Sequence, residues 1–379
     1  MKKKQVLFLK LAIALFLVFP SSAGASGTVS ARSAILIEQH TGRVLYEKDA
    51  YTVRRIASIT KIMTAILAVE SGKMNERVVV SNRAAGTEGS SLYLKQGEKI
   101  KLSDLVYGLM LRSGNDAAVA IAEHVGGSLE GFVYMMNQKA EELGMDNTHF
   151  ANPHGLDDHE NHHSTAYDMA ILTKYAMANE TYRKISGTEV HRAPNPNEPW
   201  DRVWKNKNRL LTELYKNCTG GKTGYTKRAK RTLVTTASRG GFDLIAVTLD
   251  GPDDWNDHIS MYERAISQYD IAGILKKGEI KGIEDPYYKG KVYLEKGYEY
   301  PLTADEEKKV RVEYRLLKPS KTTKENQIPR IAGKAFVFLG DKEITQLPVY
   351  SKQEPKKEES LLDYIRSFFF VTTGMYYDG

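Results

Sequence analysis

The chain has 379 residues, 41% of them hydrophobic, so it is long enough to bury a large core and to form two or more domains. Its formal net charge is +7, but four lysines lie in the first 25 residues, which contain no acidic residue, and the remainder carries +3. This balance gives no support for a nucleic-acid partner. The single cysteine, Cys218, excludes an intramolecular disulfide, and we interpret it as a packed residue.

Residues 1–25 have the pattern of a secretory signal peptide. Lysines form a basic start, residues 11–19 are an uninterrupted apolar run, and Ala23-Gly24-Ala25 is a cleavage site. The apolar run is shorter than the roughly 20 residues that a membrane-spanning helix needs. We therefore expect an exported protein.

From residue 26 to residue 275 the pattern predicts a strand hairpin, then helices, then strands and a last helix. The hairpin pairs residues 33–38 with residues 44–46. Helices are expected over residues 58–71, 102–112, 116–125, 129–143, 165–178 and 257–269, and strands over residues 77–80, 223–226, 231–238 and 242–249. Residues 189–202, rich in proline, asparagine and charge, are expected to form a surface excursion. This order implies a sheet assembled from both ends of one domain.

The composition changes from residue 276 onward. Short alternating runs separated by turns predict a small β-rich domain over residues 276–350. Residues 351–360 read as a charged linker. Residues 361–379 place apolar side chains at helical spacing opposite polar ones, which predicts an amphipathic helix in a membrane interface, although a helix docked on the β-rich domain is the alternative. With the basic leader, this indicates the outer face of a bacterial cytoplasmic membrane.

The stretch with chemical meaning begins at the first predicted helix. Ser58-Ile59-Thr60-Lys61 is an S-x-x-K pair, and residues three apart share one face of a helix. A serine hydroxyl needs a neighbouring base to become a nucleophile, and a lysine can be that base when burial and nearby charge lower its pKa. The pair alone is weak, because a capping serine and an exposed lysine give the same letters.

Two further triplets follow in order. Ser113-Gly114-Asn115 lies between two predicted helices, and Lys222-Thr223-Gly224 leads into a predicted strand. S-x-x-K, then a serine–asparagine triplet, then K-T-G is the signature set of penicillin-binding proteins and serine β-lactamases. Over residues 29–270 the sequence resembles the low-molecular-mass penicillin-binding proteins, which are serine D-alanyl-D-alanine carboxypeptidases. Asn152-Pro153-His154-Gly155-Leu156 also matches.

The resemblance implies an α+β fold, with an antiparallel sheet flanked by helices as in serine β-lactamases, followed by a small all-β domain. It implies removal of the last D-alanine from peptidoglycan stem peptides through an acyl-enzyme on Ser58, with β-lactam antibiotics as covalent inhibitors. Lys61 is the expected base, and Ser113 is expected to relay a proton to the leaving amine. We expect neither a cofactor nor a bound metal.

The remaining motif residues are expected to hold the substrate. Asn115 would hold Lys61 and the substrate backbone, and Lys222 and Thr223 would meet the terminal carboxylate. Gly224 would let the substrate lie close to the strand. By resemblance, the backbone N–H groups of Ser58 and Tyr225 form the oxyanion hole.

The sequence departs from the family pattern at two places. Ala229-Lys230 stands where relatives have Ala-Gly after the motif strand, which puts that turn in doubt. Relatives also carry a basic residue near the start of the next strand, where this chain has Asp243, and Arg239 is the nearby candidate to replace it. Carboxylate recognition is therefore the least secure part of the predicted site.

Three alternative functions agree less well with the sequence. A class A β-lactamase needs a deacylating glutamate, and its Glu-x-x-Leu-Asn pattern does not occur in this sequence. A metal hydrolase would use a cluster of histidines and acids between residues 154 and 163, but no H-E-x-x-H or comparable spacing appears. The members of that cluster are His154, Asp157, Asp158, His159, Glu160, His162 and His163. A non-catalytic wall-binding protein would not need three intact motifs.

Overall fold

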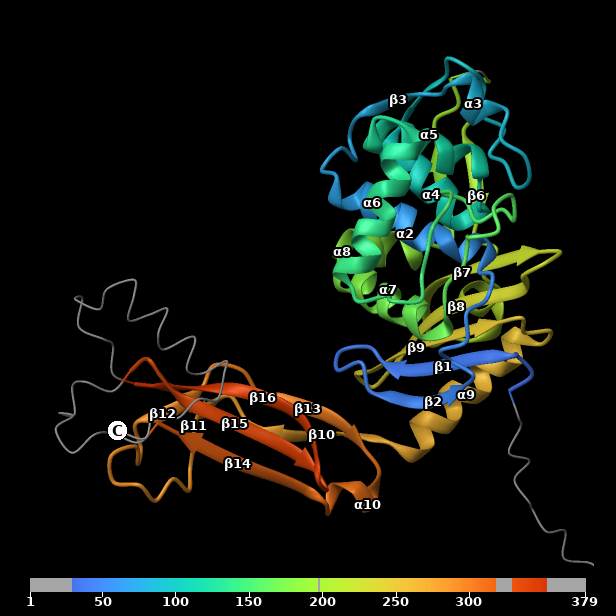
Figure 1. Cartoon of the computed structure of the whole chain (residues 1–379). Coiled ribbons are helices and arrows are strands. Elements are labelled where there is room, and N and C mark those ends of the chain that lie inside the picture. The colour runs from blue at the N-terminus through green and yellow to red at the C-terminus, as the bar shows by residue number, and fades with distance from the viewer. Residues whose placement is uncertain (1–28, 197, 318–328, 353–379) are drawn as a thin grey trace, which may run out of the picture.

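The first sheet is built from strands at both ends of the first domain. The computed structural model describes residues 29–196, 198–317 and 329–352. Among these residues the strand order is β2-β1-β9-β8-β7, with every neighbouring pair antiparallel (Figure 1). The strands are β1 (Ser33–Glu38), β2 (Val44–Lys48), β7 (Cys218–Thr226), β8 (Lys230–Arg239) and β9 (Phe242–Leu249). The pairing of β1 with β9 confirms that the two ends of the domain meet in one sheet.

The two faces of this sheet pack against different cores, because successive side chains of a strand point to opposite faces. Ile35 and Ile37 of β1 belong to the core shared with the central helices. Leu36 lies between them in sequence but packs on the other face, against α9 (Asp254–Gln268). The sheet therefore lies between two helical layers, and the predicted α+β class is confirmed.

The central helices lie close to their predicted positions. They are α2 (Lys61–Glu70), α4 (Leu102–Arg112), α5 (Asn115–Gly126), α6 (Leu129–Glu142) and α7 (Ala166–Ala178). One difference concerns the first of them, because its first turn is a 3-10 turn, η1 (Ala57–Thr60), and the α-helix begins at Lys61. In the described part of the first domain, three short helical elements were not predicted: α3 (Asn82–Ala85), α8 (Glu180–Ser186) and the π-helical turn η2 (Leu210–Leu214).

The expectation that residues 189–202 form only a surface excursion is wrong at both ends. β5 (Val190–Ala193) and β6 (Arg202–Lys205) pair as an antiparallel hairpin beside α4. The physical reason is an aromatic stack, in which the His191 ring lies 3.8 Å from that of Tyr107 and also contacts Trp204. A second short hairpin, β3 (Arg77–Val79) with β4 (Lys99–Lys101), confirms the strand predicted near residue 78.

A second group of strands follows α9. They are β10 (Asp270–Leu275), β11 (Gly278–Glu279), β12 (Val292–Leu294), β13 (Tyr298–Leu302), β14 (Val310–Leu316), β15 (Ile331–Leu339) and β16 (Lys342–Ser351), with α10 (Ala304–Glu307) before β14. Within the described residues, β11-β12-β16-β15-β14 form one sheet and β10 pairs with β13. The small β-rich domain is confirmed. Because β10 pairs with β13 of this second domain and with no strand of the first sheet in the described part of the chain, we propose that the domain boundary lies near residue 269 and not at residue 275.

Arg43 ties the first sheet to the second domain. It lies in the turn between β1 and β2, and its guanidinium donates to the Pro301 carbonyl and pairs with Glu306 at 2.5 Å. The same group stacks over the rings of Tyr269 and Tyr300, about 5 Å from each centroid (5.1 and 4.9 Å). Only 11% of the Arg43 side chain is exposed, so these contacts are made away from bulk water.

Replacing Arg43 with alanine is expected to loosen this junction. Losing two cation–π contacts and a half-buried ion pair should lower the free energy of unfolding by about 2 kcal/mol. Urea unfolding of the full chain measures the change, and Arg32→Ala is the matched control, because its pair with Asp250 leaves the Arg32 side chain 71% exposed and such pairs contribute about 0–1 kcal/mol. Equal losses in the two variants would contradict the assigned role of Arg43.

Several predictions fall outside the described residues. These are the signal peptide of residues 1–25, most of the linker of residues 351–360, and the amphipathic helix of residues 361–379. In the part of the chain that the structure describes, no helix is both long and apolar enough to cross a membrane.

Candidate active site

The first motif forms a tight turn that ends on a buried lysine. Ser58 lies in η1, and Ala57 before it adopts a left-handed conformation with φ +50°, which is unfavourable for a residue with a Cβ. Lys61 opens α2 and is fully buried. Its Nζ lies 3.1 Å from Ser58 Oγ, so the expected nucleophile and base are within hydrogen-bond reach of each other.

The partners of Lys61 determine how its amine is used. Nζ lies 2.7 Å from Asn115 Oδ1 and 2.5 Å from the His154 carbonyl, and both oxygens can only accept hydrogen bonds. A neutral amine has two hydrogens, which these two acceptors take, and one lone pair. The lone pair then faces the hydroxyl of Ser58, as a general base requires.

The burial of Lys61 and the cations near it favour this neutral form. Burial is the main cause that lowers the pKa of Lys61 well below its usual 10.5, and the positive charges of Lys222 and Lys207 lower it further. Asp116 acts in the opposite direction but does not reverse the shift.

The second motif lies where α4 passes into α5. Ser113 takes a left-handed conformation with φ +67° that turns the chain out of α4, and Asn115 is the first residue of α5. The amide Nδ2 of Asn115 donates to the Glu88 carbonyl at 2.6 Å, so its Oδ1 is the atom that faces Lys61. Ser113 is 5% exposed, two residues before the asparagine that holds the amine.

The third motif runs along β7 beside the turn of Ser58. Lys222 is 1% exposed and donates to the carbonyl of Thr223 at 2.7 Å. Burial, with a contribution from Lys207, lowers the pKa of Lys222 to about 7. A Cβ at Gly224 would overlap Thr232 Oγ1 and lie 2.9 Å from the backbone nitrogen of Ser58. Gly224 therefore lets β7 approach η1.

Comparison with known proteins agrees with this arrangement. Residues 20–253 match the model of a family described as D-alanyl-D-alanine carboxypeptidase. The chain belongs to this carboxypeptidase family. Residues 269–357 match a second model, described as penicillin-binding protein 5, C-terminal domain. The two matches divide the chain just before β10.

Relatives and solved structures of this carboxypeptidase family extend the comparison. D-alanyl-D-alanine carboxypeptidase DacF of Bacillus subtilis is 41% identical over 258 residues, which are 66% of this chain and 65% of that protein. The crystal structure of the carboxypeptidase DacD from Francisella tularensis is 26% identical, with a TM-score of 0.66, and the alignment covers 89% of this chain and 99% of that one. Penicillin binding protein 6B from Escherichia coli is likewise 26% identical, with a TM-score of 0.66, over 87% and 97% of the two chains.

The register of β8 and β9 places Asp243 and Arg239 away from the motif residues that are expected to bind the substrate carboxylate. Thr232, opposite Gly224, pairs with Leu249 near the end of β9, whereas Asp243 at its start pairs with Ser238. Asp243 binds His40 at 2.9 Å, and Arg239 binds Glu263. The concern raised by Asp243 is therefore wrong, because both residues lie at the opposite end of β8 and β9 from the motif residues.

The turn after the motif strand accommodates its unusual residue. Lys230 takes a left-handed conformation with φ +60°, the kind of conformation that glycine adopts freely. Ala229 is buried, and its N–H donates to Thr226 Oγ1 at 2.9 Å. The β7–β8 hairpin therefore forms with Lys230 at a position that suits the glycine of relatives.

The histidine cluster is used for packing and hydrogen bonding. Both ring nitrogens of His162 have protein partners, Thr60 Oγ1 and the Ala151 N–H, and burial lowers the pKa of His162 to about 3. The His154 ring accepts the Leu156 N–H, and its pKa is also lowered to about 3, mainly by burial. Among the described residues, no group of three or more histidine, cysteine or acidic side chains is placed to hold a metal ion.

Two contributors to the site were missed at the level of sequence. Lys207 follows β6 and adds positive charge beside both buried lysines. Asp116 follows Asn115 and accepts the N–H groups of Leu92 and Leu94, which holds the loop over the second motif. Both act on partners far away in sequence, so no local spacing predicts them.

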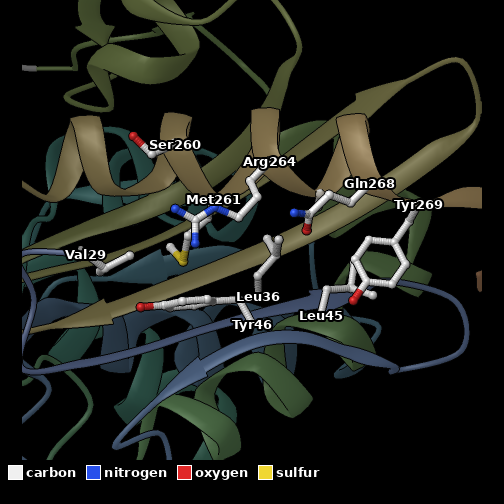
Figure 2. A pocket seen from close by; sticks show the side chains of 10 residues that line it. Val29, Leu36, Leu45, Tyr46, Ser260, Met261, Arg264, Gln268 and Tyr269 are labelled. Atoms are coloured by element: carbon white, nitrogen blue, oxygen red, sulfur yellow. The ribbon is translucent and has the colours of Figure 1, made fainter. Parts of the chain in front are cut away.

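The pocket in Figure 2 is not this site. It lies between the β1–β2 hairpin and α9, and Leu36, Tyr46 and Met261 are among its lining residues. These side chains pack on the face of the sheet opposite the central helices, whereas Ile59 of η1 packs on the helical side. The pocket therefore belongs to the packing of α9.

Cys218 fits its predicted role as a packed residue. It begins β7, lies among the α9-side apolar residues and is a free, buried thiol. Burial raises the pKa of Cys218 to about 11, so its reactive thiolate form is disfavoured.

Proposed function

We propose that the chain is a serine D-alanyl-D-alanine carboxypeptidase that trims the stem peptides of peptidoglycan. The observation that carries this proposal is the buried Lys61 amine, with its two hydrogens committed to acceptors and its third direction facing Ser58 Oγ at 3.1 Å. The match to the carboxypeptidase family supports the substrate class, and the matched region spans 65% of the DacF relative.

The proposed reaction is acyl transfer in two steps. Ser58 Oγ attacks the carbonyl carbon of the penultimate D-alanine while its proton passes to Lys61 Nζ. The C–N bond to the last D-alanine then breaks, and the leaving amine takes up a proton by way of Lys61 and Ser113. Water attacks the ester on Ser58 and gives up a proton to the neutral base; the base returns this proton to Ser58 Oγ as the ester C–O bond breaks and the shortened peptide leaves. Peptide and water are the only reactants.

The other motif residues have proposed binding roles. Asn115 orients Lys61 and the substrate backbone, and the ammonium of Lys222 with the hydroxyl of Thr223 meets the terminal carboxylate. Gly224 keeps β7 close to η1, so that the N–H groups of Ser58 and Tyr225 can face the same carbonyl oxygen. Each such donor contributes about 2.7–4 kcal/mol in a comparable serine enzyme.

The proposal is tested by incubating the purified protein with a peptide ending in Lys-D-Ala-D-Ala and quantifying free D-alanine. A parallel reaction with benzylpenicillin is followed by intact mass and by peptide mapping. We expect D-alanine release and a long-lived penicilloyl adduct on Ser58. Rapid turnover of benzylpenicillin without D-alanine release would instead identify a β-lactamase, and the absence of both reactions in folded protein would overturn the enzyme proposal.

The charge on Lys222 makes a prediction about pH. A carboxylate contact needs the protonated amine, and with a pKa of about 7 that form is lost as pH rises. The kcat/KM for D-alanine release should therefore fall on the alkaline side, and Lys222→Arg should move that limb to higher pH, because a guanidinium stays charged. A peptide with a C-terminal amide is the control, since it has no carboxylate to lose. An unmoved limb in Lys222→Arg would exclude Lys222 as its origin.

We also propose export through residues 1–25 and attachment to the outer face of the cytoplasmic membrane through residues 361–379. The apolar stripe of that segment and the lysines before it support this proposal. Sedimentation with phosphatidylglycerol vesicles tests it, using a variant that ends at Lys352. Binding that persists in the shortened protein would contradict the assigned anchor.

A further inference from the structure

The residue before the proposed nucleophile is strained and must be held by its neighbours. Ala57 has φ +50°, and a left-handed conformation in a residue other than glycine costs on the order of 1–3 kcal/mol. The peptide bond after it joins the Ala57 carbonyl to the Ser58 N–H. Because a trans peptide is planar, its C=O and N–H point in opposite directions. Whatever fixes the Ala57 oxygen therefore also fixes the direction of the Ser58 N–H.

The Ala57 carbonyl is held from the inner side of the turn. Thr60 Oγ1 donates to it at 2.8 Å, and a Cβ at Gly155 would overlap the same oxygen. The preceding carbonyl, of Ile56, accepts a bond from Thr232 Oγ1 on β8 at 2.9 Å. On the other side, the Ser58 nitrogen lies beside Gly224 of β7. The anchored peptide therefore turns the Ser58 N–H toward β7, the strand that carries Tyr225.

The donor and the acceptor of each hydrogen bond that leads to the Ala57 carbonyl follow from which atoms carry a hydrogen. The Ala151 N–H can only donate, so His162 Nδ1 accepts from it, at 3.1 Å, and carries no hydrogen. The hydrogen of the neutral imidazole is then on Nε2, which donates to Thr60 Oγ1 at 2.7 Å. The hydroxyl hydrogen of Thr60 is left for the Ala57 carbonyl. His162 and Thr60 are 2% and 0% exposed, so water does not compete for these bonds.

We propose that His162, acting through Thr60, is a positioning residue that aims the backbone N–H of Ser58 at the oxyanion. We call the series of three hydrogen bonds that runs from the Ala151 N–H through His162 and Thr60 to the Ala57 carbonyl the histidine relay. The inference rests on the proposed function, because the N–H of Ser58 matters only if acyl transfer occurs there. A misplacement of about 1 Å far from the reacting atoms can reduce a rate on the order of 100-fold.

The test separates positioning from stability. The full-length protein is mixed with a fluorescent penicillin, and rapid kinetics resolves the dissociation constant of the first complex from the rate constant of acylation. Thr60→Val and His162→Leu should lower the rate constant on the order of 100-fold with an unchanged dissociation constant. Thr60→Ser and His162→Gln keep the donor and acceptor groups, and they should restore most of the rate.

His258 supplies a matched control. It is also a buried, neutral histidine between threonine hydroxyls, Thr235 and Thr248, but it lies on α9 across the sheet. His258→Leu should lower the melting temperature without changing the acylation rate constant of the folded protein. If the relay variants behave in this way too, the relay only stabilises the fold and the inference is overturned.

Two other results would be decisive. Equal acylation rate constants in His162→Gln and His162→Leu would show that hydrogen bonding by this side chain does not affect acylation, and this result would overturn the inference. The activity of the wild type would still support the proposed function. A wild-type protein that neither releases D-alanine nor becomes acylated would overturn the proposed function and the relay together. If His162→Leu does not fold, the comparison of Thr60→Val with Thr60→Ser decides alone.

Discussion

Replacing Ser58 with alanine is expected to abolish both D-alanine release and acylation by penicillin. The methyl group keeps the turn of η1 but has no atom that can attack a carbonyl carbon. Removal of the nucleophile from another serine peptidase lowers kcat on the order of 10⁶-fold, so the remaining release should lie below detection. Release of D-alanine and the mass of the protein after exposure to benzylpenicillin are the two measurements.

The control for this variant is the serine that follows α2. Ser71 follows α2, and its Oγ donates to the Ala68 carbonyl at 2.7 Å, so Ser71→Ala removes a serine hydroxyl from the other end of the helix. It should keep its activity. A penicilloyl adduct on Ser58→Ala, mapped to any other residue, would show that the nucleophile is assigned incorrectly.

Replacing Lys61 with methionine is expected to have the second largest effect. The unbranched side chain fills the buried space, but the proton of Ser58 loses its acceptor, and general base catalysis contributes about 10²–10⁴-fold. The acylation rate constant at neutral pH should fall by that amount. In the wild type, burial and two cations lower the pKa of Lys61, so the rate should rise with pH on the acid side, where the amine loses its proton.

The pH dependence distinguishes a base from a residue that only packs. In Lys61→Met, the acylation rate constant should be low and should no longer rise with pH on the acid side of its pH profile. Lys73→Met, in the segment after α2, is the matched control and should keep both. A slow variant that retains the wild-type acid limb would assign that limb to another group, and Lys61 would then be a structural residue.

Sequence patterns predicted most of the helices and strands, because apolar spacing and turn residues within one segment are enough to determine these elements. The hairpin pattern around residues 33–46 identified β1, the apolar run of residues 242–249 identified β9, and Gly72 and Ser113 marked the ends of α2 and α4. The same patterns missed β5 and β6, since what stabilises that hairpin is the contact of His191 with Tyr107, far away in sequence.

The chemistry of the site was predictable only as far as its motifs extend. Spacing identified Ser58 and Lys61, and the structure places them 3.1 Å apart. It could not show that Lys207 adds its charge, or that Gly224 packs against Ser58, because both depend on how β6, β7 and η1 come together. The error about Asp243 has the same origin, since the register of β8 against β9 decides which end of a strand faces the motif.

The two buried lysines, Lys61 and Lys222, also lower the free energy of unfolding of the protein. A lysine whose pKa falls from 10.5 to about 7 on folding binds its proton more weakly in the folded chain, and below pH 7 that difference is worth roughly 5 kcal/mol of destabilisation for Lys222. The unfolded chain binds more protons between pH 7 and 10.5, so this burden shrinks as pH rises through that window. Lys222→Met should therefore melt at a higher temperature than the wild type, so the charge proposed to bind substrate lowers the stability of the fold that holds it.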